Sequence, residues 1–150
     1  AARTGTPQVL APGALDMVNF FGAAGVPERF AGRRIHRHSE NSYLMRTTPG
    51  ENAEIGRRIA EKLNAATGPV TFLFPLRGVS ALDAEGQPFF DPDADAALRA
   101  ALGENLRPPV RFETLDCHIN DDAFAEAAVR TLLASLPTAA MEQSHAQDHR

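Results

Sequence analysis

The chain has 150 residues, of which 43% are hydrophobic and 23% are charged, and its formal net charge is −4. This composition is typical of one soluble domain that buries its own core. The single cysteine, Cys117, excludes an internal disulfide framework or a cysteine-based zinc knuckle and suits the reducing cytoplasm, where we expect the protein. The acidic balance excludes nucleic acid as the obvious partner, and no apolar run reaches the roughly 18 to 20 residues of a membrane span.

The N-terminal part of the chain carries mixed signals. Residues 7–11 form an apolar run closed by a Pro-Gly pair, which predicts a buried strand that ends in a turn. Residues 14–21 fit either a short helix or a descending loop, and residues 22–34, interrupted by glycines and a proline, are expected to be irregular. Further on, Tyr43–Met45 favours a strand, whereas residues 36–41 are too polar for a core.

A helix is clearly predicted to begin after Thr48. Residues 48–51 form a capping box with proline at the first helical position, so that the Thr48 hydroxyl and the Glu51 carboxylate each satisfy a free backbone N–H. Ile55, Ile59 and Leu63 then recur every four residues on one apolar stripe. Gly68-Pro69 ends the helix.

The next strand and helix are predicted with similar clarity. Residues 70–74 are almost continuously apolar, as in a parallel strand covered on both faces, and residues 75–83 form the loop that leaves it. Asp91-Pro92 opens a second helix, with Asp93 and Asp95 at its positive N-terminal end. The inward face of this helix is expected to consist of Ala94, Leu98, Ala101 and Leu102.

A last strand and helix complete the pattern. Residues 110–117 alternate less regularly as a strand, and Asn120-Asp121-Asp122 caps a third helix that Pro137 terminates. Residues 138–150, which include His145 and His149, are expected to form a disordered tail. The apolar stripe of the third helix is predicted at Phe124, Ala128, Leu132 and Leu136.

This alternation of strands and helices predicts an α/β fold, namely a Rossmann-like, mostly parallel sheet flanked by helices, in one domain over residues 1–137. Ligands of such sheets bind beyond the carboxyl ends of the strands. Residues 13–19, 75–83 and 118–120 should meet at that edge, so we expect any functional site there.

Histidines are candidate acid–base or metal-binding groups. His36 and His38 point to the same side if their segment is extended, and Asp16, Asp83 or His118 would have to complete a metal site. No third ligand lies at a diagnostic spacing, and Arg37 between the two histidines disfavours a cation, so no metal is expected. The alternative is a polar loop that packs on the sheet or binds an anion.

The loop after the second strand is a candidate anion-binding nest. Residues 77–83 lack the glycine and lysine pattern of a P-loop and the glycine pattern of a dinucleotide fold, so nucleotide binding is not indicated. Ser80 lacks one glycine of a nucleophile elbow and is expected to cap a turn. Arg46, beside a helix N-terminus, suits a carboxylate or phosphate, or else a surface salt bridge. The candidate ligand-binding residues are Gly13, Asp16, Asn19, Arg46, Gly78, Ser80, Asp83 and Asn120.

Six ordered motifs resemble the C-terminal domain of the tomato-mosaic-virus-resistance-like ATP-binding family, an uncharacterised protein family. They are residues 12–20 (PGALDMVNF), 26–30 (VPERF), 36–38 (HRH), 44–48 (LMRTT), 78–83 (GVSALD) and 119–121 (IND). The resemblance implies two Rossmann-like domains in the family, with ATP bound by an N-terminal domain outside this chain. It also implies an intracellular protein that self-associates. The start at Ala1, without methionine, agrees with a fragment of a longer, two-domain polypeptide whose sheet is incomplete here.

Three readings of function follow. The first is the C-terminal domain of an ATP-binding-family protein, with a cleft for a small anionic or nucleotide-linked ligand and a surface that binds another copy or the N-terminal domain. The second is a hydrolase or lyase that acts on a small carbonyl or phosphorylated metabolite, with His36, His38 or His118 as the acid–base group. The third is a purely structural interaction domain. The sequence leaves open whether the domain is an enzyme.

Overall fold

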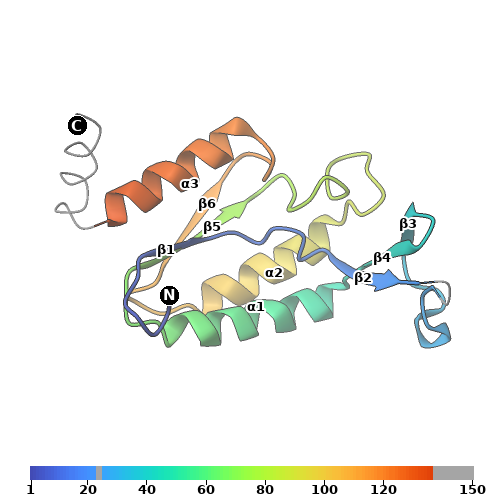
Figure 1. Cartoon of the computed structure of the whole chain (residues 1–150), viewed down its shortest axis with the longest axis horizontal. Helices are drawn as coiled ribbons and strands as arrows, with labels where there is room; N and C mark the ends of the chain where they lie inside the picture. Colours follow the sequence, from blue (N-terminus) through green and yellow to red (C-terminus); the bar gives the residue numbers. More distant parts are fainter. Residues whose placement is uncertain (23–24, 137–150) are drawn as a thin grey trace, which may run out of the picture.

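Three parallel strands form the central sheet of the chain. A computed structural model describes residues 1–22 and 25–136, and in it β1 (Gln8–Leu10), β5 (Val70–Pro75) and β6 (Arg111–Leu115) pair in the order β1-β5-β6. Figure 1 shows α1 (Pro49–Asn64) and α2 (Pro92–Asn105) on one face of this sheet and α3 (Asp122–Ser135) on the other. The predicted α/β fold is confirmed. The proposed tail, residues 138–150, lies outside the described residues.

A second, antiparallel sheet corrects the prediction for the N-terminal third. β2 (Met17–Phe21), β3 (Ile35–Ser39) and β4 (Ser42–Arg46) pair in the order β2-β4-β3, and a short 3-10 turn, η1 (Glu28–Phe30), lies between β2 and β3. The predicted strand at Tyr43–Met45 is confirmed. Of residues 14–21, expected to be a short helix or a loop, residues 14–16 form a turn but residues 17–21 are the strand β2. The strand forms because every residue of β2 pairs with β4, which is a tertiary interaction. The sequence alone does not reveal it, since a short apolar run fits the periodicity of a helix and of a strand equally well.

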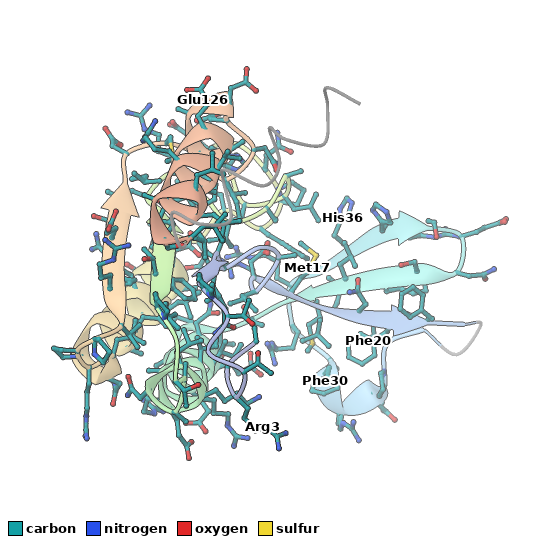
Figure 2. The ribbon with its side chains drawn as sticks, turned by 60° about the vertical axis from the view of Figure 1, so that its left-hand side comes forward. Arg3, Met17, Phe20, Phe30, His36 and Glu126 are labelled. Atoms are coloured by element: carbon teal, nitrogen blue, oxygen red, sulfur yellow. The ribbon has the colours of Figure 1, made fainter. Side chains whose placement is uncertain are left out.

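The antiparallel sheet extends away from the parallel one (Figure 1). Figure 2 shows Phe20 of this sheet beside Phe30 of η1, and their ring centroids lie 5.5 Å apart. β3 is an exposed edge strand, which explains its polar sequence. The antiparallel sheet is connected to the main body through residues 12–17, which precede β2, and through Arg46 at the end of β4. Both connections lie close to the carboxyl ends of the parallel strands.

The capping box of α1 is present as predicted. The Thr48 Oγ1 accepts from the Glu51 N–H at 3.2 Å, and the Glu51 carboxylate accepts from the Thr48 N–H at 2.8 Å. The inward face is only partly the predicted one, since Leu63 is buried but Ile55 and Ile59 are half-buried at the edge of the core. The most buried positions of this helix are Asn52, Gly56, Ala60 and Leu63.

The core lies between the parallel sheet and the α1–α2 pair. All six residues of β5 are buried, as predicted for a central parallel strand, and Phe72 and Phe74 contact Leu98 and Leu102 of α2 in one cluster. The predicted inward face of α2 is confirmed. No helix in the described part of the chain is long and apolar enough to span a membrane.

The buried face of α3 differs from the predicted stripe. Phe124 is buried as expected, but the second buried residue is Ala127, and Leu132 is 39% exposed. α3 packs on β1 and β5 of a narrow three-stranded sheet, so one side of the helix suffices to cover it. An apolar strip on the outer side, which includes Val129 and Leu133, faces solvent.

Candidate functional site

A cavity of about 240 Å³ opens beyond the carboxyl end of β5, at the edge of the sheet where α/β proteins bind their ligands. Its lining comes from two segments, the end of β5 with the following loop, and the first turns of α2 with Phe90 shortly before them. It combines apolar side chains with two guanidinium groups and one carboxyl group. The lining residues are Phe74, Leu76, Arg77, Gly78, Phe90, Pro92, Asp95, Ala96 and Arg99.

Behind this cavity, Arg46 is buried between two carboxyl groups. Its Nη2 lies 2.8 Å from the Asp95 Oδ1 and 3.4 Å from the Asp83 Oδ1, and its Nε donates to the Phe89 carbonyl at 2.8 Å. Nη1 donates to the Asp16 carbonyl and to the Thr47 hydroxyl. The guanidinium is therefore satisfied inside the protein, in a buried network and not in the surface salt bridge that the sequence favoured as the alternative. Contact between Arg46 and an external anion stays a prediction.

Asp83 and Asp95 compete for the single guanidinium. The Asp83 side chain is fully buried, and its Oδ2 accepts from the Val79 N–H at 2.9 Å. The Asp95 side chain keeps 18% of its surface exposed and lines the cavity. Burial, together with the nearby charge of Asp83, raises the pKa of Asp95 to about 7, although Arg46 acts in the opposite direction. Asp95 thus exchanges a proton near neutral pH.

Asp16 and Ser80 form a second buried pair next to this network. The Ser80 hydroxyl donates to the Asp16 Oδ2 at 2.7 Å and accepts from the Leu82 N–H at 3.1 Å, so Ser80 caps a turn as expected. Asp16 is fully buried, and this burial raises the pKa of its carboxyl group, with a smaller contribution from Asp83. A buried serine whose hydroxyl is committed in this way is positioned for structure and not for nucleophilic attack.

His118 is held by both of its ring nitrogens. Its Nδ1 accepts from the Asn120 N–H at 3.1 Å, so the proton of the neutral ring is on Nε2, which donates to the Ser80 carbonyl at 2.9 Å. With both nitrogens engaged, His118 fixes the loop of Ser80 against the start of α3. This geometry favours a positioning role over the acid–base role considered from the sequence.

Gly78 allows the loop to close on itself. Its φ of +120° belongs to the region that favours glycine, and a Cβ there would collide with the Asp83 carbonyl and lie 2.9 Å from the His118 ring. Gly13 is less restricted, because a Cβ would only touch Ile119 at 3.6 Å. Of the two predicted glycines, only Gly78 lines the cavity.

The remaining candidates lie apart from the cavity. Asn19 is exposed on β2, His38 is exposed on β3, and His36 packs edge-on against Phe89 with the ring centroids 6.2 Å apart (Figure 2). Asn120 contributes its backbone N–H, as described above. Within the described residues, no three His, Cys, Asp or Glu side chains are placed to hold a metal ion.

Two charged residues of α2 that line the cavity are not among the predicted site residues. From the sequence, Asp95 is expected only as a charge that favours the helix N-terminus, and no role is predicted for Arg99. The available signal was their spacing, because residues four apart lie on one face of a helix, and this face begins directly after Asp91-Pro92. Arg99 is exposed and makes no hydrogen bond or ion pair with any described residue, whereas Arg77 binds Asp116 through two nitrogens.

Comparison with known proteins places the chain among longer relatives. Residues 1–136 match the model of the C-terminal domain of an uncharacterised protein family, UPF0261. A UPF0261 protein of Rhizobium meliloti is 58% identical over 130 residues, which are 85% of this chain and 33% of that protein. The tomato (Solanum lycopersicum) ToMV resistance protein Tm-1(GCR237) is 47% identical over 133 residues, which are 87% of this chain and 18% of the tomato protein. The chain spans about a third of the length of the bacterial relative.

Proposed function

The chain belongs to the UPF0261 C-terminal domain family, and we propose that this domain binds a small anionic ligand in the cavity at the carboxyl end of β5. The observation that carries the proposal is the Arg99 guanidinium, which lines this cavity together with apolar side chains and has no ion-pair or hydrogen-bond partner among the described residues. Binding is proposed for the domain alone. ATP, which the family resemblance assigns to an N-terminal domain, would be bound outside this chain.

The charges around the cavity support an anion. Arg77 is neutralised by Asp116, so among the described residues of the lining Arg99 supplies the positive charge for a ligand, while Phe74 and Leu76 offer apolar contact. Pockets that combine apolar walls with a few placed polar groups are typical of small-molecule sites. A carboxylate or phosphate bound to a guanidinium forms strong, charge-assisted hydrogen bonds.

The enzyme reading has weaker support. His36 and His38 are on the antiparallel sheet, His118 is engaged through both nitrogens, and none of the three lines the cavity. A hydrolase or lyase would need an acid–base group within reach of its substrate. We therefore favour a binding module over a self-contained catalyst.

A protein-binding surface is the second candidate function, favoured by the outer face of α3. Val129 is 59% exposed and Leu133 is 49% exposed, next to Glu126 and Arg130. Exposed apolar patches with a polar rim mark interaction sites. We propose that another copy of the chain binds here, in agreement with the expected self-association.

Calorimetric titration tests the cavity directly. Isobutyrate, inorganic phosphate and ATP would be titrated separately into the chain and into the variants Arg99→Gln and Arg130→Gln. We expect isobutyrate or phosphate to bind, Arg99→Gln to weaken that binding at least about tenfold, and Arg130→Gln, an exposed arginine of α3, to have no effect. Absence of binding by every probe, or equal loss in both variants, would contradict the proposal.

A further inference from the structure

One guanidinium contacts two carboxyl groups behind the cavity and lies next to a third residue of the same kind, and this imbalance bears on what the proposed ligand site binds. Arg46 contacts the carboxyl groups of Asp83 and Asp95, and Asp16 adjoins them through its own carbonyl. A single positive charge cannot neutralise three carboxylates in a buried environment, so the cluster retains protons. The question is which carboxyl group exchanges its proton with the cavity.

Burial singles out Asp95. The Asp16 and Asp83 side chains have no exposure, whereas Asp95 lines the cavity with 18% of its side chain exposed. Asp83 also accepts a hydrogen bond from the Val79 N–H, so its carboxyl group is held inside the loop. Asp95 has no such backbone donor among the described residues, and its carboxyl group lies between Arg46, which stabilises the ionised form, and Asp83, which stabilises the protonated form. It is the carboxyl group of the cluster that both solvent and a ligand reach.

The groups that face Asp95 come from every element packed around it. β4 contributes Arg46, the loop that follows β5 contributes Arg77 and Asp83, and α2 contributes Arg99 together with its cap, Asp91. Arg77 is paired with Asp116, and Asp91 is paired with Arg34. No histidine is among the lining residues of the cavity. The net charge that a ligand meets there changes by one when Asp95 gains or loses its proton.

We infer that the cavity takes up a small monocarboxylate with a short apolar body together with one proton, which Asp95 holds. This inference rests on the proposed anion binding and adds to it the ligand class and the coupling. The ligand carboxylate lies toward Arg99, and its apolar body lies against Phe74, Leu76 and Phe90. Protonated Asp95 removes a negative charge from the site and adds an O–H donor, whereas the ionised form repels the ligand.

The size of the effect follows from the fraction of protein that can bind. Because the pKa of Asp95 is raised to about 7, this group is mainly protonated at pH 6 and mainly ionised at pH 8. When only the protonated form binds, the apparent Kd is the intrinsic Kd divided by that fraction, which gives a change of about tenfold between the two pH values. Isobutyrate itself stays ionised throughout this range.

The experiment compares isobutyrate with its neutral analogue, isobutyramide, by calorimetry at pH 6, 7 and 8 in two buffers of different ionisation enthalpy. The wild-type chain should bind isobutyrate about tenfold more tightly at pH 6 than at pH 8, with proton uptake at pH 7, and should not bind isobutyramide. Asp95→Asn keeps an acceptor for Arg46 and should bind isobutyrate with no pH dependence and no proton uptake. Glu85→Gln, which lies outside the cavity lining, is the matched control and should behave as the wild type.

The outcomes separate the two proposals. Equal affinity for isobutyrate at pH 6 and pH 8 without proton uptake overturns the coupling and leaves anion binding intact. A pH dependence that survives in Asp95→Asn assigns the proton elsewhere and also overturns the inference. Absence of isobutyrate binding at every pH overturns the ligand class, and phosphate binding in the earlier titration then decides whether the anion site itself stands. Circular dichroism of Asp95→Asn confirms that the variant is folded.

Discussion

At the scale of single residues, Arg46 has the largest structural role. Its side chain is 2% exposed and makes hydrogen bonds to segments 37 to 49 residues away, so it ties β4 to the loop before α2 and to α2 itself. Buried ion pairs contribute little net stability compared with apolar packing, but removing one partner leaves the other charge buried without compensation. The consequence of removing Arg46 is therefore large even though its net contribution is not.

We expect Arg46→Ala to lower the free energy of unfolding by about 3–5 kcal/mol at pH 8, because Asp83 and Asp95 lose their shared cation. The loss should be smaller at pH 5, where the carboxyl groups can take up protons instead. Urea denaturation followed by circular dichroism measures both values. Arg57→Ala, at an exposed i,i+3 pair with Glu54, should change little. A loss for Arg46→Ala no larger than for Arg57→Ala would contradict the buried network.

Stability should also depend on pH through Asp95. The pKa of this group is about 7 in the folded chain and near 3.8 in the unfolded chain, so between these values the folded state binds more protons. Its contribution is fully present below about pH 4 and is lost as the pH rises through about 7, with a slope of up to about 1.4 kcal/mol per pH unit. Asp16, whose pKa is also raised, acts in the same direction.

We therefore expect Asp95→Asn to flatten the dependence of stability on pH between about pH 5 and pH 7.5, and to be at least as stable as the wild type at pH 8. Thermal or urea unfolding across this range tests the sign. An unchanged slope in the variant would show that Asp95 does not titrate in this window.

Residue-level prediction from sequence succeeded where the interaction is local. The Thr48–Glu51 capping box spans three residues and is read directly from the sequence. By contrast, the network of Arg46 joins residues from separate elements, and no local pattern indicates which aspartate meets which arginine. The expectation that loops meet beyond the carboxyl ends of parallel strands placed Asp16, Ser80 and Asp83 near one another, as they are in the structure. It does not apply to Asp95, which lies on a helix.

At the scale of elements, the regular α/β part was predictable and the antiparallel sheet was not. The apolar run of β5 and the helical spacing of apolar residues in the helices are visible in the sequence. By contrast, β2 and β3 are short, partly exposed strands that form only through pairing with β4. Pairing is a long-range property, and strand propensity is weak without it. For α3, the sequence predicted the helix correctly, but the buried residues differ from the predicted apolar stripe. The reason is that a three-stranded sheet covers only part of the helix.

The packing of α1 on α2 gives a test with two glycines. A Cβ on Gly56 of α1 would lie 2.8 Å from the Ala101 Cβ and 3.0 Å from the Leu98 carbonyl of α2, closer than normal contacts. Gly103 of α2 has room, with its nearest neighbour, the Phe112 ring, at 3.5 Å. Alanine improves helix propensity by up to about 1 kcal/mol at either position, but overpacking costs about 1–3 kcal/mol.

We expect Gly56→Ala to destabilise the chain by about 1–2 kcal/mol and Gly103→Ala to stabilise it by about 0.5–1 kcal/mol, as measured by urea unfolding. The opposite signs come from the same substitution in two helices, so a general effect of alanine cannot produce them. If Gly56→Ala were stabilising as well, the close approach of α1 and α2 would be wrong.

At the scale of the whole molecule, the cavity beyond β5 and the outer face of α3 are separate surfaces. The cavity opens between the β5 loop and α2, whereas α3 lies on the opposite face of the parallel sheet from α2 (Figure 1). Figure 2 shows Glu126 of α3 at the top of the main body, away from the antiparallel sheet that carries His36. A partner bound on α3 therefore leaves the cavity accessible, and the two proposed functions can be tested independently.

The outer face of α3 is suited to a second copy of itself. Ala125, Val129 and Leu133 follow one another at intervals of four, and Glu126 and Arg130 flank this strip on the same side. In an antiparallel pair of α3 helices about a two-fold axis near Val129, Glu126 of each copy faces Arg130 of the other, so the strip is complementary to itself in both shape and charge. One such helix pair is smaller than a standard interface, which predicts a dimer that dissociates on dilution.

We expect the wild-type chain to shift from dimer to monomer as its concentration falls through the micromolar range, and the double variant Val129→Lys, Leu133→Lys to be monomeric throughout. Val129→Lys places a charge at the centre of the apolar strip, close to its own symmetry mate, and Leu133→Lys places a second charge against Ala125 of the other copy. Together the two lysines should raise the dimer Kd by well over tenfold. Sedimentation equilibrium measures the Kd, and Phe21→Lys, at a residue 75% exposed on the antiparallel sheet, controls for the loss of an exposed apolar side chain elsewhere. A charge exchange, Glu126→Arg with Arg130→Glu, preserves complementarity between identical copies and should keep the dimer, whereas Glu126→Arg alone should weaken it. A wild-type chain that is monomeric at several hundred micromolar, or a dimer that withstands both lysines, would rule out α3 as the site of self-association.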